Sequence, residues 1–326
     1  MTAARADRTP GSGTGARVVV AMLVCLLAGA AATGAALLAG HPSRSPGPAP
    51  EHCLAKGSDA VVLAGAQRGR YEQNHLEKAT VIDAGSARWD GTEPYVVVAG
   101  GTDRVCLTGG SIEGAWPRRT PWDTMHGTGA IVIDAPGSVV EDLRVDGYGD
   151  SIRFVERAQD FVVRRVHLSF SRDDCVENDW LHSGTVENSL LDGCYNAFSA
   201  RPYAGQSGLR DGSHNLWTIR DSLVRLQPMP RPYLDQGLIP GTAGFFKWDA
   251  RAPRLSLTRN VFRADQRAGT VGLGIPADKL AGCSHNVMVW LGDGPYPDPL
   301  PSCFTVTTDV RVWNDAVARW RHQQAS

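Results

Sequence analysis

The sequence lacks any surplus of positive charge. Its 33 Lys and Arg residues are balanced by 34 Asp and Glu residues, which leaves a formal net charge of -1. Proteins that bind nucleic acids usually carry a basic excess or a basic stripe, because contacts to phosphate dominate their affinity. We therefore expect no nucleic-acid partner. Lysine itself is scarce, a bias that we attribute to base composition rather than to chemistry: the chain has only Lys56, Lys78, Lys247 and Lys279.

From about Ala60 onward the sequence also lacks long helical periodicity, which argues against a helical solenoid. It consists instead of short runs of Val, Ile and Leu that are separated by Gly, Asp and Asn. Examples are ATVIDAG, PYVVVAGG and GAIVIDAPGSVV. This pattern is typical of many short strands joined by tight turns.

The N-terminal segment contains a long apolar run, Val18 to Ala39, and three arginines precede it. A run of this length is sufficient to span a bilayer, and the basic residues before it favour a cytoplasmic N-terminus. We expect residues 1–17 in the cytoplasm, a signal anchor at 18–39, a Pro/Ser/Gly-rich linker at 40–52 and an extracellular domain at 53–326. The expected location is the cell membrane, with a single span. The alternative is secretion after cleavage of a signal peptide.

Cysteine usage agrees with export. Cys25 lies in the apolar run, and the remaining six cysteines form an even set, as expected of disulfides in an oxidising compartment. Their order in the chain suggests the pairs Cys53–Cys106, Cys175–Cys194 and Cys283–Cys303. This is one of fifteen possible connectivities, and the others stay open.

A repeat runs through the middle of the chain. The segment VEDLRVDGYGDSIRFV from Val140 aligns without gaps with VRRVHLSFSRDDCVEN from Val163 and VENSLLDGCYNAFSAR from Val186, at a spacing of 23 residues. Apolar residues recur in two columns of this alignment, and a third column combines glycine with phenylalanine. The columns are Val145, Leu168 and Leu191; Ile152, Cys175 and Phe198; and Gly147, Phe170 and Gly193.

Units of this length cannot bury an apolar face alone and are stable only when stacked. Because each unit consists of short strand-like runs separated by turn residues, the repeat predicts an all-β fold, a parallel β-helix whose coils are about 23 residues long. The Asn-containing frame of leucine-rich repeats is absent, and a β-sandwich would not give such registration. The tail from Val310 has the pattern of a short amphipathic helix, which we expect to cap the open end of the solenoid.

The same register concentrates acidic residues. It places Asp150, Asp173 and Asn196 in one column, with Asp174 next along the chain and Glu177 three positions further. Neighbouring coils lie about 4.8 Å apart, so ionising all of these carboxylates would cost free energy through their mutual repulsion. Either one keeps its proton and can act as a general acid, or a cation such as Ca²⁺ neutralises the cluster. Alternatively, the acids only cap turns through hydrogen bonds to the backbone.

The stacked pattern between Thr102 and Trp290 resembles the right-handed parallel β-helix of the pectin-lyase-like superfamily. Asp173-Asp174-Cys175 is similar to the Asp-Asp-Cys motif of polygalacturonase-type glycoside hydrolases, and Asp150 stands where those enzymes carry another Asp. Cys194 matches the cysteine that accompanies their Gly-His-Gly motif, but Tyr195-Asn196-Ala197 stands in place of the motif itself. The nearest counterpart of their Arg-Ile-Lys motif is Phe246-Lys247-Trp248.

We therefore expect an enzyme that processes an acidic polysaccharide. Asp150, Asp173 and Asp174 are the candidate catalytic residues, because one carboxylic acid can protonate the leaving oxygen while another carboxylate activates water. Arginine and lysine can hold a sugar carboxylate, aromatic rings can stack on sugars, and a histidine can replace the missing one. The candidate substrate-binding residues are Asn196, Arg201, Lys247, Trp180, His182 and Arg153.

Two alternatives remain open. One is a Ca²⁺-dependent polysaccharide lyase on the same scaffold, in which Asp150, Asp173, Asp174 and Glu177 would bind the metal and Arg201 would be the base. The other is a non-catalytic surface protein that binds glycan or only extends from the membrane. No cofactor is certain and Ca²⁺ is the one considered. The expected partners are a polysaccharide or cell-surface glycan and the membrane, and the chain is expected to be a monomer.

Overall fold

The computed structural model describes residues 53, 58–202, 210–230, 240–269 and 271–325. The predicted anchor at 18–39 and the predicted linker at 40–52 lie outside these residues. Within the described part of the chain, no helix combines the length and the apolar character needed to cross a membrane.

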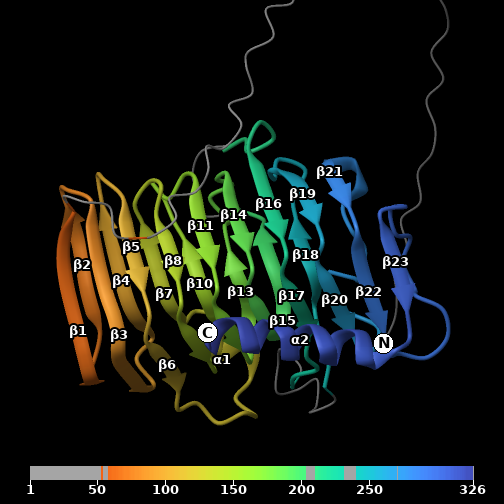
Figure 1. The fold of residues 1–326 in the computed structure, drawn as a ribbon, viewed down its shortest axis with the longest axis horizontal. Coiled ribbons are helices and arrows are strands. Elements are labelled where there is room, and N and C mark those ends of the chain that lie inside the picture. The colour runs from red at the N-terminus through yellow and green to blue at the C-terminus, as the bar shows by residue number, and fades with distance from the viewer. Residues whose placement is uncertain (1–52, 54–57, 203–209, 231–239, 270, 326) are drawn as a thin grey trace, which may run out of the picture. The chain divides into compact units, whose positions relative to one another are not determined.

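The described chain is all-β, as the sequence predicts, and its strands join in one large sheet in which every strand pairing is parallel (Figure 1). The pairings divide the sheet into three ladders, and successive strands of the chain visit the ladders in turn. We call them ladders A, B and C. This arrangement is compatible with a parallel β-helix.

The candidate site lies on ladder A, and ladder B forms the next side of the same stack. Ladder A comprises β2 (Tyr71–Leu76), β4 (Tyr95–Gly101), β7 (Gly129–Asp134), β10 (Asp150–Phe154), β13 (Ser171–Glu177), the second half of β15 (Leu190–Ala200) and β18 (Gly244–Trp248). Ladder B comprises the first halves of β1 (Asp59–Gln67) and β3 (Thr80–Gly91), followed by β5 (Val105–Thr108), β8 (Val139–Glu141), β11 (Phe161–Arg164), β14 (Gly184–Glu187), β16 (Leu216–Arg220), β19 (Arg254–Thr258) and β21 (Leu280–Ser284).

Ladder C completes the stack, and three helices accompany the strands within the described residues. Ladder C comprises the second halves of β1 and β3, β6 (Ser111–Gly114), β9 (Arg144–Asp146), β12 (His167–Ser169), the first half of β15, β17 (Leu223–Leu226), β20 (Val261–Ala264), β22 (Asn286–Trp290) and β23 (Phe304–Thr307). The helices are α1 (Trp122–Met125), a 3₁₀ turn at Ala277–Lys279 and α2 (Val310–Ala325).

Apolar side chains from the three ladders form one continuous core. Val145, Leu168 and Leu191 are paired across ladder C and are almost completely buried, so this predicted column is confirmed. Each such side chain contributes roughly 1.5–3 kcal/mol when it leaves water. Stacking therefore supplies the apolar contacts that a single coil cannot make alone.

The second predicted column is wrong by one residue. Ile152 pairs with Val176, and Val176 pairs with Phe198, so Cys175 is not in the column. The cause is an extra residue in β13, which shifts the register within the coil. Gapless alignment of the sequence cannot detect it, because the following coil compensates for the shift.

The three suggested disulfides are confirmed. Cys53 is bonded to Cys106, Cys175 to Cys194 and Cys283 to Cys303, with Cα–Cα distances of 5.6, 5.5 and 5.7 Å. Disulfides of this number are typical of chains that fold in an oxidising compartment.

The C-terminal helix α2 forms as predicted but does not cap the open end. It lies across ladder C (Figure 1), where Trp313, Val317 and Trp320 pack with Leu190 of β15, Leu223 of β17 and Val289 of β22. The Trp320 Nε1–H group donates to the carbonyl oxygen of Asn188 at 2.9 Å. Ladder C turns several apolar side chains outward, and this surface is what the apolar side of α2 covers.

Lateral packing of α2 leads to a stability prediction. Trp320→Ala should lower the free energy of unfolding of the full chain by about 3 kcal/mol, because it removes a large side chain from the helix–sheet contact. Arg319→Ala, on the exposed side of the same helix turn, should change it by less than about 0.5 kcal/mol. Urea denaturation followed by tryptophan fluorescence and circular dichroism measures both. Equal effects of the two substitutions would contradict the packing.

Candidate functional site

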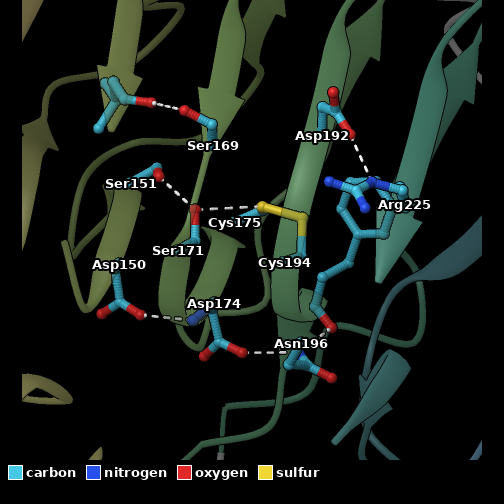
Figure 2. The surroundings of a disulfide bond; sticks show 12 residues. Asp150, Ser151, Ser169, Ser171, Asp174, Cys175, Asp192, Cys194, Asn196 and Arg225 are labelled. Atoms are coloured by element: carbon cyan, nitrogen blue, oxygen red, sulfur yellow. Dashed lines mark hydrogen bonds and ion pairs between the residues drawn. A yellow bond between two sulfur atoms is a disulfide. The ribbon is translucent and has the colours of Figure 1, made fainter. Parts of the chain in front are cut away.

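The acidic residues gather on ladder A where β10, β13, β15 and β18 lie side by side. Pairing of Ile152 with Val176 makes Asp150 the neighbour of Asp174, and Asp174 is paired with Asn196. Figure 2 shows these three side chains in one row, beside the Cys175–Cys194 disulfide. The predicted stacking of Asp150 on Asp173 is therefore wrong, and Asp174 takes that place.

A β-bulge in β13 causes this exchange. Asp174 stands three positions after Ser171, whereas its partner Asn196 stands only two positions after Cys194, the partner of Ser171 on β15. The extra residue bends the strand and redirects a side chain, as bulges beside functional sites commonly do. Asp173 leaves the row, and its carboxyl group accepts a hydrogen bond from Trp122, the first residue of α1. The two consecutive acids consequently have different surroundings.

The two acids within the row are fully buried and fully hydrogen-bonded. Asp150 Oδ1 accepts the backbone N–H of Asp174 at 3.0 Å, and Asp150 Oδ2 accepts the Arg153 guanidinium. Asp174 Oδ1 accepts Asn196 Nδ2–H at 2.6 Å, and Asp174 Oδ2 accepts the Lys247 ammonium at 2.8 Å. Charge-assisted bonds of this kind are what allow carboxylates to remain buried.

A second row lies on the outer side of the same strands. Arg153 pairs with Glu177, Glu177 with Ser199 and Ser199 with Lys247. Arg153 Nε lies 3.1 Å from Glu177 Oε1. The side chains of Arg153, Glu177 and Lys247 are 19%, 16% and 15% exposed, so these groups form the solvent side of the cluster. The site thus has a cation at each end and carboxylates between them.

Burial raises the pKa of most acids in the cluster. It raises the pKa of Asp173 well above its ordinary value, and the neighbouring Asp174 carboxylate adds to this. Burial likewise raises the pKa of Glu177 well above its ordinary value, with Asp150 adding to the effect. The pKa of Asp174 rises only to about 6, because Lys247 opposes the effect of burial. The two adjacent acids therefore differ, because the Lys247 ammonium limits the rise in pKa at Asp174.

Two further groups support the cluster and were missed by sequence reasoning. Asp179 Oδ1 accepts the Ser199 hydroxyl and the backbone N–H of Arg201, and burial raises the pKa of Asp179. Arg172 is buried, lies over the Tyr195 ring and donates from Nε to the carbonyl oxygen of Thr120 at 3.3 Å. Arg172 thereby anchors the loop that brings Trp122 to Asp173. A hint was present in the sequence, because this loop interrupts the repeat.

The disulfide between Cys175 and Cys194 links the bulged strand β13 covalently to β15. It joins β13 to β15 directly beside Asp174, and Cys175 Sγ lies 3.2 Å from the Ser171 hydroxyl at the other end of the bulge (Figure 2). Ser171 in turn bonds to Ser151 on β10. The bulge is consequently tied to both neighbouring strands.

The predicted set of metal ligands is altered. Asp150, Asp174 and Glu177 each offer an oxygen within 4.8 Å of the other two, and Asp173 is not part of this group. Calcium prefers six to eight oxygen ligands, but here the Arg153 guanidinium bonds to Asp150 and Glu177, and Lys247 bonds to Asp174. Each of the three carboxylates therefore already bonds to a cation of the chain itself. These residues therefore fit Ca²⁺ poorly.

The other predicted substrate-binding residues are divided between two places. Asn196, Lys247 and Arg153 belong to the cluster, as described above. Trp180 and His182 line a separate pocket, together with Arg210. Arg201 is exposed, and it reaches the cluster through its backbone N–H.

Comparisons of this chain with models of protein families, with curated proteins and with solved structures found no match. The site must therefore be judged by its own geometry.

The raised pKa of Asp174 has a consequence for stability. A carboxyl group with a pKa of about 6 in the folded state and 3.8 when unfolded binds protons more readily in the folded state. Its contribution is complete below about pH 4 and is lost as the pH rises through 6, by roughly 3 kcal/mol in all. Asp174→Asn should therefore gain stability relative to the wild type between pH 4 and pH 7. Denaturation at several pH values measures the difference, and a constant difference would contradict the burial.

Titration of His182 should change stability with pH in the opposite direction to Asp174. Burial lowers its pKa from 6.5 to about 4, and its ring nitrogens lie 3.1 Å from Gln159 Oε1 and 3.3 Å from the carbonyl oxygen of Val155. The unfolded chain then binds the extra proton between pH 4 and 6.5, so stability falls as the pH drops through this range, by roughly 3 kcal/mol. His182→Gln lacks this loss. The same denaturation series should show the wild type losing stability relative to this variant below pH 6.

Proposed function

We propose that residues 53–326 form the catalytic domain of an extracellular enzyme that cleaves a glycosidic bond in an acidic polysaccharide. The proposed scaffold is a right-handed parallel β-helix with coils of about 23 residues. We further propose that residues 18–39 anchor the chain in the cell membrane with this domain outside. The observation that carries the proposal is the bulge in β13, which gives the adjacent acids Asp173 and Asp174 different surroundings and different hydrogen-bond partners.

Asp173 is the proposed general acid. Burial raises its pKa well above the ordinary value and so favours the protonated form, and its bond to Trp122 orients the carboxyl group. Proton donation to the leaving oxygen is the step that a glycosidase requires of such a group. The protein obtains this acid by burial and by the adjacent negative charge, the physical means by which carboxyl groups are tuned in general.

Asp174 is the proposed acceptor that activates water. A pKa of about 6 leaves it ionised at neutral pH yet basic enough to take a proton. Asp150 holds the Asp174 backbone in place through the 3.0 Å hydrogen bond, so it acts as a positioning residue. Lys247 must release Asp174 Oδ2 when water binds, and its ammonium is then free to meet a substrate carboxylate.

Asn196 supports a substrate beside this pair. Its Nδ2 group is committed to Asp174 and to the carbonyl oxygen of Phe198, whereas its buried Oδ1 has no hydrogen-bond partner among the residues that the structure describes. An unsatisfied buried acceptor costs roughly 1–3 kcal/mol. A hydroxyl group of the substrate, or a bound water, would satisfy it.

The activity prediction follows from these roles. The full chain should release new reducing ends from polyuronides. Asp173→Asn and Asp174→Asn should each lower kcat by about 100- to 10,000-fold, whereas Asp142→Asn, at an exposed ion pair away from the cluster, should leave kcat unchanged. A reducing-sugar assay measures all four proteins. Full activity in Asp173→Asn would overturn the assignment of the acid.

Ultraviolet absorbance of the products and the effect of a chelator separate the alternatives. A Ca²⁺-dependent lyase would produce an unsaturated sugar with ultraviolet absorbance and would lose activity with a chelator, whereas the hydrolase produces no such absorbance and keeps its activity. Because Arg153 and Lys247 already bond to the three candidate ligands, calorimetric titration with Ca²⁺ should show no binding at millimolar concentration. A non-catalytic glycan-binding protein would turn over none of a broad panel of polysaccharides.

A further inference from the structure

A pocket of 310 Å³ lies beside the turns that follow β10 and β13, and we call it the Trp180 pocket. None of the clustered acids lines it. Its volume is at the small end of the range for small-molecule sites, which suits a single compact ligand. The lining residues are Glu156, Arg157, Gln159, Trp180, Leu181, His182, Arg210, Asp211 and Asn215.

The turn that carries Trp180 is held rigidly. Asn178 at the start of the turn bonds to both backbone groups of His182 at its end: its Oδ1 accepts the His182 N–H at 3.0 Å, and its Nδ2 donates to the His182 carbonyl oxygen at 2.9 Å. Leu181 has a φ of 63°, which is unfavourable for a bulky residue, and Asn215 Nδ2 donates to its carbonyl oxygen at 2.6 Å. Strain of this kind persists where the surroundings determine the conformation, often at binding sites.

Arg210 provides the positive charge that is available to a ligand in the pocket. Its guanidinium carbon lies 3.9 Å from the centre of the Trp180 ring, so the ring supports the cation. Arg157, the other arginine of the pocket, is paired with Asp134. Arg210, by contrast, has no carboxylate within ion-pair distance among the described residues. Its N–H groups are therefore available to bind an oxyanion in a two-pronged manner.

The remaining polar groups suit a ligand that is rich in hydroxyl groups. His182 is neutral at physiological pH because burial lowers its pKa to about 4, and Gln159 and Asn215 add uncharged amides. Glu156 and Asp211 also line the pocket, so a ligand with several negative charges would be repelled. One negative charge next to Arg210 and hydroxyl groups elsewhere is the pattern that these side chains complement.

We infer that the Trp180 pocket binds one acidic sugar residue, with its carboxylate on Arg210. This site is distinct from the acid cluster and does not require the proposed cleavage. It would hold a carboxylate-bearing unit of a glycan while other units lie elsewhere.

Calorimetry of the full chain with glucuronate tests the inference, with glucose as the matched neutral probe. Glucuronate should bind at least tenfold more tightly than glucose. Arg210→Ala should weaken glucuronate binding at least tenfold, and Arg210→Lys should weaken it less, because it keeps the charge but loses the fork. Arg220→Ala on β16, which removes an exposed arginine outside the pocket, should have no effect. Equal binding of the two sugars, or unchanged binding in Arg210→Ala, would overturn the inference.

One more comparison separates this inference from the proposed function. Asp173→Asn should abolish cleavage of polyuronides and leave glucuronate binding unchanged. Cleavage by the wild type without glucuronate binding would overturn only the pocket. Glucuronate binding without any cleavage would overturn only the enzymatic role and leave the pocket in place.

Discussion

Hydrogen bonds between parallel strands hold β10, β13, β15 and β18 at the spacing of a sheet, and the chemistry of the site depends on how β13 fits into that ladder. The ladder cannot absorb the extra residue of β13 without displacing one side chain. Asp173 is displaced toward Trp122, and Asp174 keeps its place between Asp150 and Asn196. A disulfide on one side and the Ser151–Ser171 bond on the other stabilise this arrangement. A slip of one residue in the pairing would remove the difference between the two acids.

Charge compensation is the second constraint. Burying an ionised acid costs several kcal/mol of desolvation free energy unless a nearby cation offsets it. Arg153 offsets this cost for Asp150 and Glu177, and Lys247 offsets it for Asp174. The compensation is incomplete, since the pKa values of Asp173, Asp174, Glu177 and Asp179 remain raised. Burial therefore still favours the protonated form of these carboxyl groups.

Ladder A and the turns that follow its strands carry two different sites, the acid cluster and the Trp180 pocket. The strands themselves carry the acid cluster, where backbone pairing on both sides limits movement. The turns beyond β10 and β13 carry the Trp180 pocket. Strand pairing is absent from these described turns, and hydrogen bonds of the Asn178 side chain, together with the positive φ of Leu181, determine the backbone conformation instead. Ladder C has a structural role, since α2 covers its outward apolar side chains.

The sequence by itself determined the all-β fold, the stacking of Val145, Leu168 and Leu191 and the gathering of the acids, because these follow from period and local composition; cysteine order suggested the disulfide pairing that the structure confirmed. Only the tertiary structure decided which acid stands beside Asp150, because a bulge that the next coil compensates leaves the alignment gapless. It also placed Trp180 and His182 in a pocket of their own and laid α2 across ladder C. These outcomes depend on contacts between residues that are distant in the chain, such as Trp320 with Asn188 and Lys247 with Asp174, and no local pattern encodes them.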